Sequence, residues 1–149
     1  MKEFRNIYKI ARVSANMSQE IAAEYLHTSS RSLSDYESGK TIPPDDIVCF
    51  MIELYEAPWL AYEYLRTSST VGQKFLPIID FSDLAKTVLR FQKEVGDVHQ
   101  INRDMIEIAC DGEIDHKEEG RWNQVSREIW EMISAGLSVV FAQQSRKTC

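Results

Sequence analysis

Residues 18–40 read SQEIAAEYLHTSSRSLSDYESGK, and this stretch decides the fold. It contains two helical patterns, each directly preceded by a serine, Ser18 and Ser29. A serine hydroxyl at such a position accepts a backbone N–H that the first turn of a helix leaves unpaired. The spacing predicts one helix over 19–26 and a second over 30–38. Because only two residues separate the first helix from the second cap, we expect the two helix N-termini, with their free N–H groups, to lie close together.

The flanking sequence predicts three more helices. Apolar residues at helical spacing form the first helix of the chain, and Pro43, Pro44 and Asp45 restart it into a fourth. Pro58 opens a last short helix that carries Trp59. The side chains expected to face the interior are Phe4, Ile7, Tyr8, Ile10 and Ala11 in the first helix, Ile21, Ala22, Tyr25 and Leu26 in the second, and Ile47, Phe50, Met51, Leu54 and Tyr55 in the fourth.

An ordered series of residues carries a family resemblance. This part of the chain resembles the lambda-repressor-like (Xre-type) helix-turn-helix domain. The resemblance rests on the series Ser18-Gln-Glu-x-Ala-Ala-x-x-Leu26, then Ser29-x-x-x-Leu33-Ser-x-Tyr-Glu37-x-Gly-Lys40 and Pro43. The resemblance covers about residues 2–66. It implies a five-helix domain that binds double-stranded DNA with the 30–38 helix in the major groove.

The resemblance also implies roles for individual residues. Gln19 matches a glutamine that binds backbone phosphate and reaches a base edge. Arg31 is the strongest candidate for reading a base, because its planar fork pairs with the O6 and N7 acceptors of guanine. Lys40 and Thr41 match positions that lie along the phosphates. The full set expected to contact DNA is Gln19, Ser29, Ser30, Arg31, Ser34, Asp35, Lys40 and Thr41.

Other positions match or depart from the family pattern. Arg12 and Glu37 match a partly buried ion pair that ties the first helix to the end of the third, and Trp59 matches a core tryptophan. His27 stands where the family often has glycine, which predicts a positive φ there. Asp35 faces the groove, where a carboxylate repels phosphate and is useful only if it accepts a hydrogen bond from cytosine N4.

The net charge works against binding a polyanion. It is −6, and the pI is near 5.1. Residues 1–66 carry 7 basic and 10 acidic side chains, and residues 67–149 carry 10 and 13, so each part stands at −3. Contact with DNA must therefore come from local geometry rather than from a basic domain.

Cysteine usage and hydropathy indicate a reducing, cytoplasmic setting. Cys49, Cys110 and Cys149 are odd in number and lack metal-ligand spacing, so neither a disulfide framework nor a zinc site is expected. No signal-peptide run and no bilayer-spanning stretch is visible. A glycine-rich phosphate loop, a metal-ligand cluster and an activated nucleophile are also missing, so we expect neither an enzyme nor a metal or cofactor.

The C-terminal half predicts a helical hairpin behind a boundary at Thr67–Gln73. We place the DNA-binding domain at 1–68 and a dimerisation or regulatory hairpin at 69–149. Apolar residues recur at the three-four spacing of a helix seam, and Asp115 with Glu118 has the spacing of a capping box for the last helix. The side chains expected in the hairpin or dimer core are Phe81, Leu84, Val88, Phe91, Val95, Val98, Trp122, Val125, Ile129, Ile133, Leu137 and Val140.

Three details of the hairpin qualify this pattern. Gly96 is expected to weaken or kink the first hairpin helix. Asn102 falls on the seam, where it either fixes the register or marks a solvated helix end. The acidic loop 111–115 is too short for a calcium-binding loop and lacks its ladder of alternating ligands.

The apolar stripes are broader than one hairpin can bury, with extra positions at Leu89, Ile101, Ile106 and Trp130. Either the N-terminal domain or the hairpin of a second chain must cover them. A symmetric dimer is the economical choice, because paired half-sites need paired recognition helices. A hairpin behind such a domain also resembles prophage-type regulators.

The sequence therefore predicts an all-α protein, with a five-helix lambda-repressor-like domain followed by a long antiparallel hairpin. The predicted function is sequence-specific binding of a DNA operator as a homodimeric transcriptional regulator, a repressor or an activator. The alternative is an antitoxin-like or anti-repressor interaction module that keeps the fold without binding DNA, favoured by the acidic balance and by Asp35. No membrane partner is expected, and the sequence names no effector.

Overall fold

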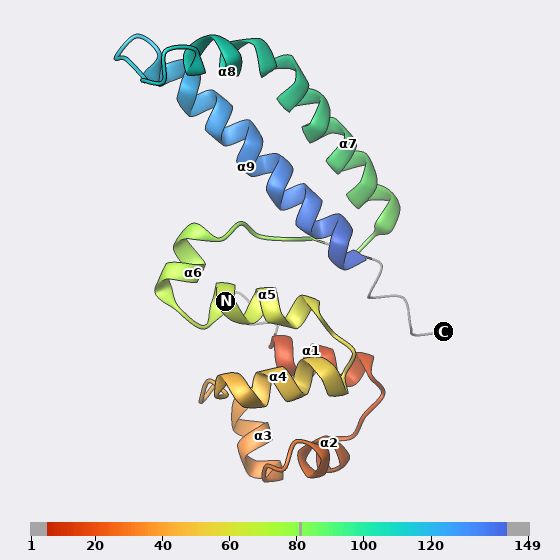
Figure 1. Cartoon of the computed structure of the whole chain (residues 1–149). Coiled ribbons are helices and arrows are strands. Elements are labelled where there is room, and N and C mark those ends of the chain that lie inside the picture. The colour runs from red at the N-terminus through yellow and green to blue at the C-terminus, as the bar shows by residue number, and fades with distance from the viewer. Residues whose placement is uncertain (1–5, 81, 143–149) are drawn as a thin grey trace. The chain divides into compact units, whose positions relative to one another are not determined.

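The computed structural model describes residues 6–80 and 82–142. Within these ranges every regular element is a helix, which confirms the all-α prediction (Figure 1). The chain divides into two compact units, one ending at Leu76 and one beginning at Pro77. No helix in the described part of the chain is both long enough and apolar enough to span a bilayer.

The first unit contains the five predicted helices and a sixth. They are α1 (Ile7–Ser14), α2 (Gln19–Tyr25), α3 (Ser30–Glu37), α4 (Asp45–Leu54), α5 (Trp59–Thr67) and α6 (Thr70–Phe75). The predicted caps are confirmed: the Ser18 hydroxyl accepts the Ile21 N–H, and the Ser29 hydroxyl accepts the Ser32 N–H. The positive φ predicted at His27 is confirmed at 50°, and Gly39 after α3 has a φ of 77°.

The core of this unit is formed by small, aliphatic and aromatic side chains from several helices. The fully or nearly buried apolar residues include Tyr8, Ala11, Ala22, Ala23, Leu26, Leu33, Val48, Met51, Tyr55, Trp59 and Leu60. The predicted interior positions Ile10, Ile21, Tyr25 and Phe50 are wrong, because their side chains are exposed. In α2 the inward face is centred on the two alanines, so the larger side chains on either side turn to the surface. Phe4 lies outside the described residues.

The polar stretch predicted as the domain boundary contains a helix. The Ser69 hydroxyl accepts the Gly72 N–H and so caps α6, which packs against α5. A Cβ at Gly72 would overlap the carbonyl oxygens of Leu65 and Arg66, so only glycine permits this close approach. The compact units consequently divide at Leu76 and Pro77, rather than near the predicted boundary at 68.

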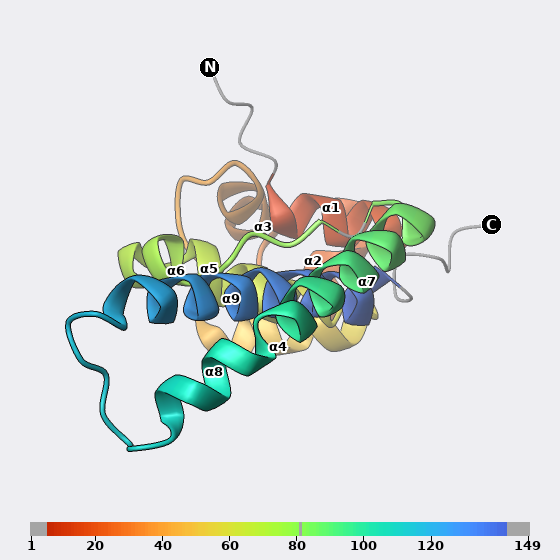
Figure 2. The same cartoon turned by 90° about the horizontal axis from the view of Figure 1, so that it is seen from above.

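The second unit is the antiparallel hairpin. It consists of α7 (Leu84–Gln100), α8 (Asn102–Ala109) and α9 (Glu119–Ala142), and α7 lies alongside α9 in both views (Figures 1 and 2). Helix α7 runs unbroken through Gly96, and the break falls at Ile101 instead. The capping box before α9 is confirmed, because the Asp115 carboxylate accepts the Glu118 N–H while the Glu118 carboxylate accepts the Asp115 N–H.

The interior of the hairpin is more polar than the apolar pattern predicted. Thr87 and Glu94 are the buried side chains of α7, and on α9 the buried ones are Val125, Ser134, Ala135, Ser138 and Ala142. Two serines of α9 hold the segment before α7: Ser134 donates to the Ile78 carbonyl at 2.8 Å, and the Asp80 N–H donates to the Ser138 hydroxyl at 3.1 Å. Of the predicted core, Leu84, Phe91, Val98, Trp122, Ile129 and Leu137 are half-buried, and Phe81 lies outside the described residues.

Four predicted core residues form a partly exposed surface instead. We call it the apolar face; it consists of Val88, Val95, Ile133 and Val140, which are 38%, 38%, 37% and 58% exposed. Phe91 packs on Gly136, where a Cβ would lie 3.4 Å from its ring. Val88 and Val95 lie three residues before and four residues after Phe91. Ile133 and Val140 have the same spacing around Gly136. Residues at these spacings share a helix face, so we infer that all four border the contact between Phe91 and Gly136. They do not form the interior of the hairpin.

Candidate nucleic-acid interface

Helices α2 and α3 form a tight pair joined by a short turn. Leu26 and Leu33 are buried where the two helices meet. The positive φ of His27 turns the chain, and the Thr28 N–H donates to the Ala23 carbonyl at 3.0 Å. This geometry fixes the orientation of α3 relative to α2.

One face of α3 is open to solvent and polar. Ser30, Arg31 and Ser34 are exposed, whereas Leu33 is buried on the opposite side of the helix. The guanidinium of Arg31 makes no hydrogen bond or ion pair with any other residue that the structure describes. An exposed cation with all its donors unused is well suited to a ligand outside the chain.

Asp35 is engaged by a neighbouring cation. The Lys40 ammonium lies 3.1 Å from the Asp35 carboxylate, with side chains 72% and 30% exposed. The backbone N–H groups of Lys40 and Thr41 also donate to the Asp35 carbonyl, at 3.0 and 3.4 Å. The acidic charge at the end of α3 is thus largely offset, and sequence reasoning did not anticipate this pairing.

Gln19 is held at the start of α2. Its side-chain amide donates to the Glu37 carboxylate at 3.1 Å, and the residue is half-buried. Gln19 is therefore positioned by contact with the last residue of α3. This hydrogen bond links the start of α2 to the end of α3.

A buried ion pair anchors that arrangement to α1. Arg12 donates to the two carboxylate oxygens of Glu37 at 2.6 and 2.9 Å, and it donates to the Met17 carbonyl at 2.7 Å. The hydrogen bonds to Glu37 raise the pKa of Arg12 above its usual value, against the opposing effect of burial. Because both charges are fully partnered, the pair fixes the end of α3 without leaving a buried polar group unsatisfied.

Asn6 is a second link between α1 and α3 that sequence reasoning missed. Its carboxamide oxygen accepts the N–H groups of Tyr8 and Lys9, which caps α1, and its amide donates to the Tyr36 carbonyl at 2.8 Å. The capping half of this role had a signal, since an asparagine directly before an apolar helical run is a typical N-cap.

Comparison with known proteins gives a match in this region. Residues 9–58 match the family model described as Helix-turn-helix, which spans α1 to α4 and the turn after α4. Neither the curated proteins nor the solved structures compared with the chain give a match. The chain therefore carries an N-terminal helix-turn-helix domain.

Proposed function

We propose that the protein is a cytoplasmic, sequence-specific transcriptional regulator that binds double-stranded DNA as a homodimer, with α3 in the major groove. The observation that carries this proposal is the exposed guanidinium of Arg31, which has no partner among the described residues and lies on the second helix of a helix-turn-helix pair. The helix-turn-helix match supports DNA binding and transcription regulation in general. The base contact and the dimer are our inferences.

Arg31 is assigned the reading role. A guanidinium that projects from the first turn of α3 pairs in bidentate fashion with the O6 and N7 acceptors of guanine. Ser30 and Ser34 share the exposed face and supply hydroxyls to a neighbouring base edge or phosphate. Asp35 then serves as the partner of Lys40 or as an acceptor for cytosine N4.

The remaining candidates orient the domain on the phosphate backbone. The N-terminus of α3 at Ser29, the amide of Gln19 and the loop residues Lys40 and Thr41 offer donors of the kind that bind phosphate oxygens. Few of these groups are cations, and the chain is acidic overall. A single domain should therefore bind non-specific DNA weakly, so useful affinity requires two domains acting together.

The apolar face supports pairing of two chains through the hairpin. Four partly exposed apolar side chains that border a single contact are costly to leave in water, since each buried methylene is worth about 0.8 kcal/mol. In a two-fold dimer the same patch would meet itself, and α7 and α9 of both chains would form a four-helix arrangement. Such a dimer presents two copies of α3 to paired half-sites.

Selection of duplexes from a random DNA pool tests this function. The wild-type chain, shown by circular dichroism to be folded, should enrich a two-fold symmetric sequence with half-sites about one helical turn apart. The same selection with Arg31→Ala should lose the enrichment at one base position of each half-site. No enrichment by folded, dimeric wild-type protein would contradict DNA recognition and would favour a protein-interaction module instead.

A further inference from the structure

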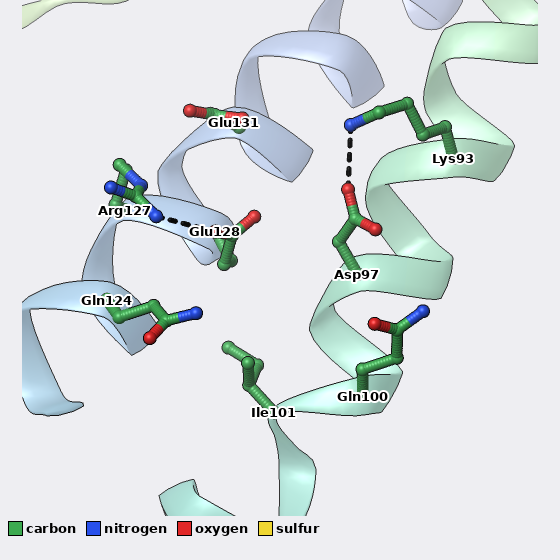
Figure 3. A pocket seen from close by; sticks show the side chains of 8 residues that line it. All are labelled: Lys93, Asp97, Gln100, Ile101, Gln124, Arg127, Glu128 and Glu131. Atoms are coloured by element: carbon green, nitrogen blue, oxygen red, sulfur yellow. Dashed lines mark hydrogen bonds and ion pairs between the residues drawn. The ribbon is translucent and has the colours of Figure 1, made fainter.

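A polar groove lies between α7 and α9, and several charged side chains from both helices line it (Figure 3). Its volume is about 460 Å³. Lys93 and Asp97 enter it from α7, and Arg127, Glu128 and Glu131 enter it from α9. The proposed DNA contacts and the apolar face use none of these residues.

Two glutamates of the groove, Glu128 and Glu131, form a cluster with Glu94, a buried residue that does not itself line the groove. Glu94, Glu128 and Glu131 each contribute a carboxylate oxygen that lies within 4.8 Å of the other two, the one such group found among the residues that the structure describes. The two residues of α9 are three positions apart, so they share a helix face, and Glu94 faces them from α7. No local sequence motif signals this cluster, because its members are 34 and 37 residues apart across the hairpin.

Glu94 supplies a second observation, independent of the clustering. The residue is only 5% exposed, and one of its carboxylate oxygens is buried without a hydrogen-bond partner in the described structure. The other oxygen lies 3.4 Å from the Lys93 ammonium. A buried carboxylate oxygen with no partner is costly, so this oxygen requires a cation or a donor beyond those that the described residues provide.

The cations already present are shared with other carboxylates. Lys93 makes its shorter contact with Asp97, at 2.7 Å, and Arg127 lies 3.1 Å from one oxygen of Glu128. Glu131 makes no ion pair or hydrogen bond with any described residue. The groove and the cluster together contain four acidic side chains and two basic ones, namely Glu94, Asp97, Glu128 and Glu131, with Lys93 and Arg127. With the carboxylates ionised, their net charge is −2, which equals the charge that one divalent cation neutralises.

We propose that Glu94, Glu128 and Glu131 bind a calcium ion. An all-oxygen donor set is the kind that hard divalent cations prefer. Two oxygens on opposite sides of Ca²⁺ stand about 4.6 to 5.2 Å apart, and on opposite sides of Mg²⁺ about 4.0 to 4.2 Å. The three oxygens lie within 4.8 Å of one another, a separation that a Ca²⁺ ion bound between them can span. Ca²⁺ also tolerates irregular coordination by carboxylates, whereas Mg²⁺ demands near-ideal octahedral geometry and usually keeps several of its waters.

Calorimetric titration of the full-length protein with calcium chloride tests the site. Wild type should bind one Ca²⁺ per chain and should bind Mg²⁺ more weakly. Glu131→Gln, at an exposed position that should not disturb folding, and Glu94→Gln should each weaken Ca²⁺ binding by at least about tenfold. Ca²⁺ should also raise the thermal unfolding temperature of wild type, because it binds the folded hairpin, and should raise it less in both variants.

Glu113→Gln is the matched control. It removes the same charge from the exposed acidic loop before α9, away from the cluster, and should bind Ca²⁺ as wild type does. The proposal is overturned if wild type shows no saturable Ca²⁺ binding, if both cluster variants bind as tightly as wild type, or if Mg²⁺ binds as well as Ca²⁺. Since no DNA is present, the result is independent of whether the chain binds an operator.

Discussion

Individual contacts position α3, and the Arg12–Glu37 pair is the most deeply buried of them. Its side chains are 10% and 4% exposed, and Gln19 adds a hydrogen bond to the same carboxylate. Removing one partner of such a pair leaves a buried charge uncompensated, which costs more than the pair contributes when intact.

Glu37→Gln should therefore destabilise the first unit by about 3 to 5 kcal/mol. Hydrogen exchange of backbone amides in α1 and α3 measures this directly, because it reports the stability of these helices separately from that of the hairpin. Glu53→Gln, at an exposed position of α4, is the control and should leave exchange unchanged. Equal protection in the two variants would show that the ion pair does not anchor α3.

Buried tyrosines make the first unit sensitive to alkali. Burial raises the pKa of Tyr8 and of Tyr55 to about 12, compared with about 10 in an unfolded chain. Between these values the unfolded chain has lost protons that the folded chain retains, so the free energy of unfolding falls as pH rises from about 10 to 12. Urea denaturation at pH 9, 10 and 11 measures this decline.

Tyr55→Phe separates the two tyrosines. The Tyr55 hydroxyl is buried without a hydrogen-bond partner in the described structure, so its removal should cost little stability at pH 7. The variant should also lose less stability than wild type between pH 10 and 12. An unchanged alkaline decline would mean that Tyr55 ionises alike in the folded and unfolded chains.

Some of these residue-level features could be predicted from the sequence, and others could not. The serine caps follow from local chemistry, because each involves a residue and its near neighbours in the chain. The positive φ at His27 is implied by the family resemblance, which places a glycine at that position. The Lys40 contact with Asp35 depends on how the chain turns at Gly39, and the bond from Asn6 to the Tyr36 carbonyl spans 30 residues. Neither could be read without the tertiary structure.

At the scale of helices, periodicity predicted which segments are helical but not which way each one faces. In α7 the stripe that includes Val88 and Val95 is partly exposed, whereas Thr87 and Glu94 are buried. The apolar pattern of a single helix cannot distinguish a face that packs inside the hairpin from one that packs on another chain. The exposure of the apolar face favours packing on another chain.

Val95→Glu tests that choice. A carboxylate at a position that is 38% exposed in the single chain should leave the hairpin folded but should prevent two apolar faces from meeting. Sedimentation equilibrium should show a dimer for wild type and a monomer for the variant. Leu65→Glu, in α5 of the first unit at a position 60% exposed, is the control and should remain dimeric.

Two results would rule out this interface. A monomeric wild type would exclude any dimer at the concentrations measured. A Val95→Glu protein that stays dimeric would place the dimer contact elsewhere on the chain.

For the whole molecule, the main obstacle to the proposed function is charge repulsion, because an acidic chain is proposed to bind DNA, which is also negatively charged. The net charge of −6 opposes association, and few cations stand near α3. Lys40 is the one cation among the proposed phosphate contacts, which gives two per dimer, so the logarithm of operator affinity should fall with the logarithm of salt concentration with a slope of about −2. Fluorescence anisotropy at several salt concentrations measures this slope, and a slope of about −10 would require many more phosphate contacts than the candidate residues near α3 provide.

The most direct test of the central claim compares the affinity of wild type and Arg31→Ala for the selected operator and for a random duplex. We predict that the substitution weakens operator binding by about 1 to 3 kcal/mol for each guanine that Arg31 binds, and that it relaxes the preference at one base position. Binding to the random duplex should change far less. Arg103→Ala, which removes an exposed arginine from the hairpin, should bind the operator as wild type does. Equal operator affinity for wild type and Arg31→Ala would contradict the assignment of α3 as the helix that reads DNA through Arg31.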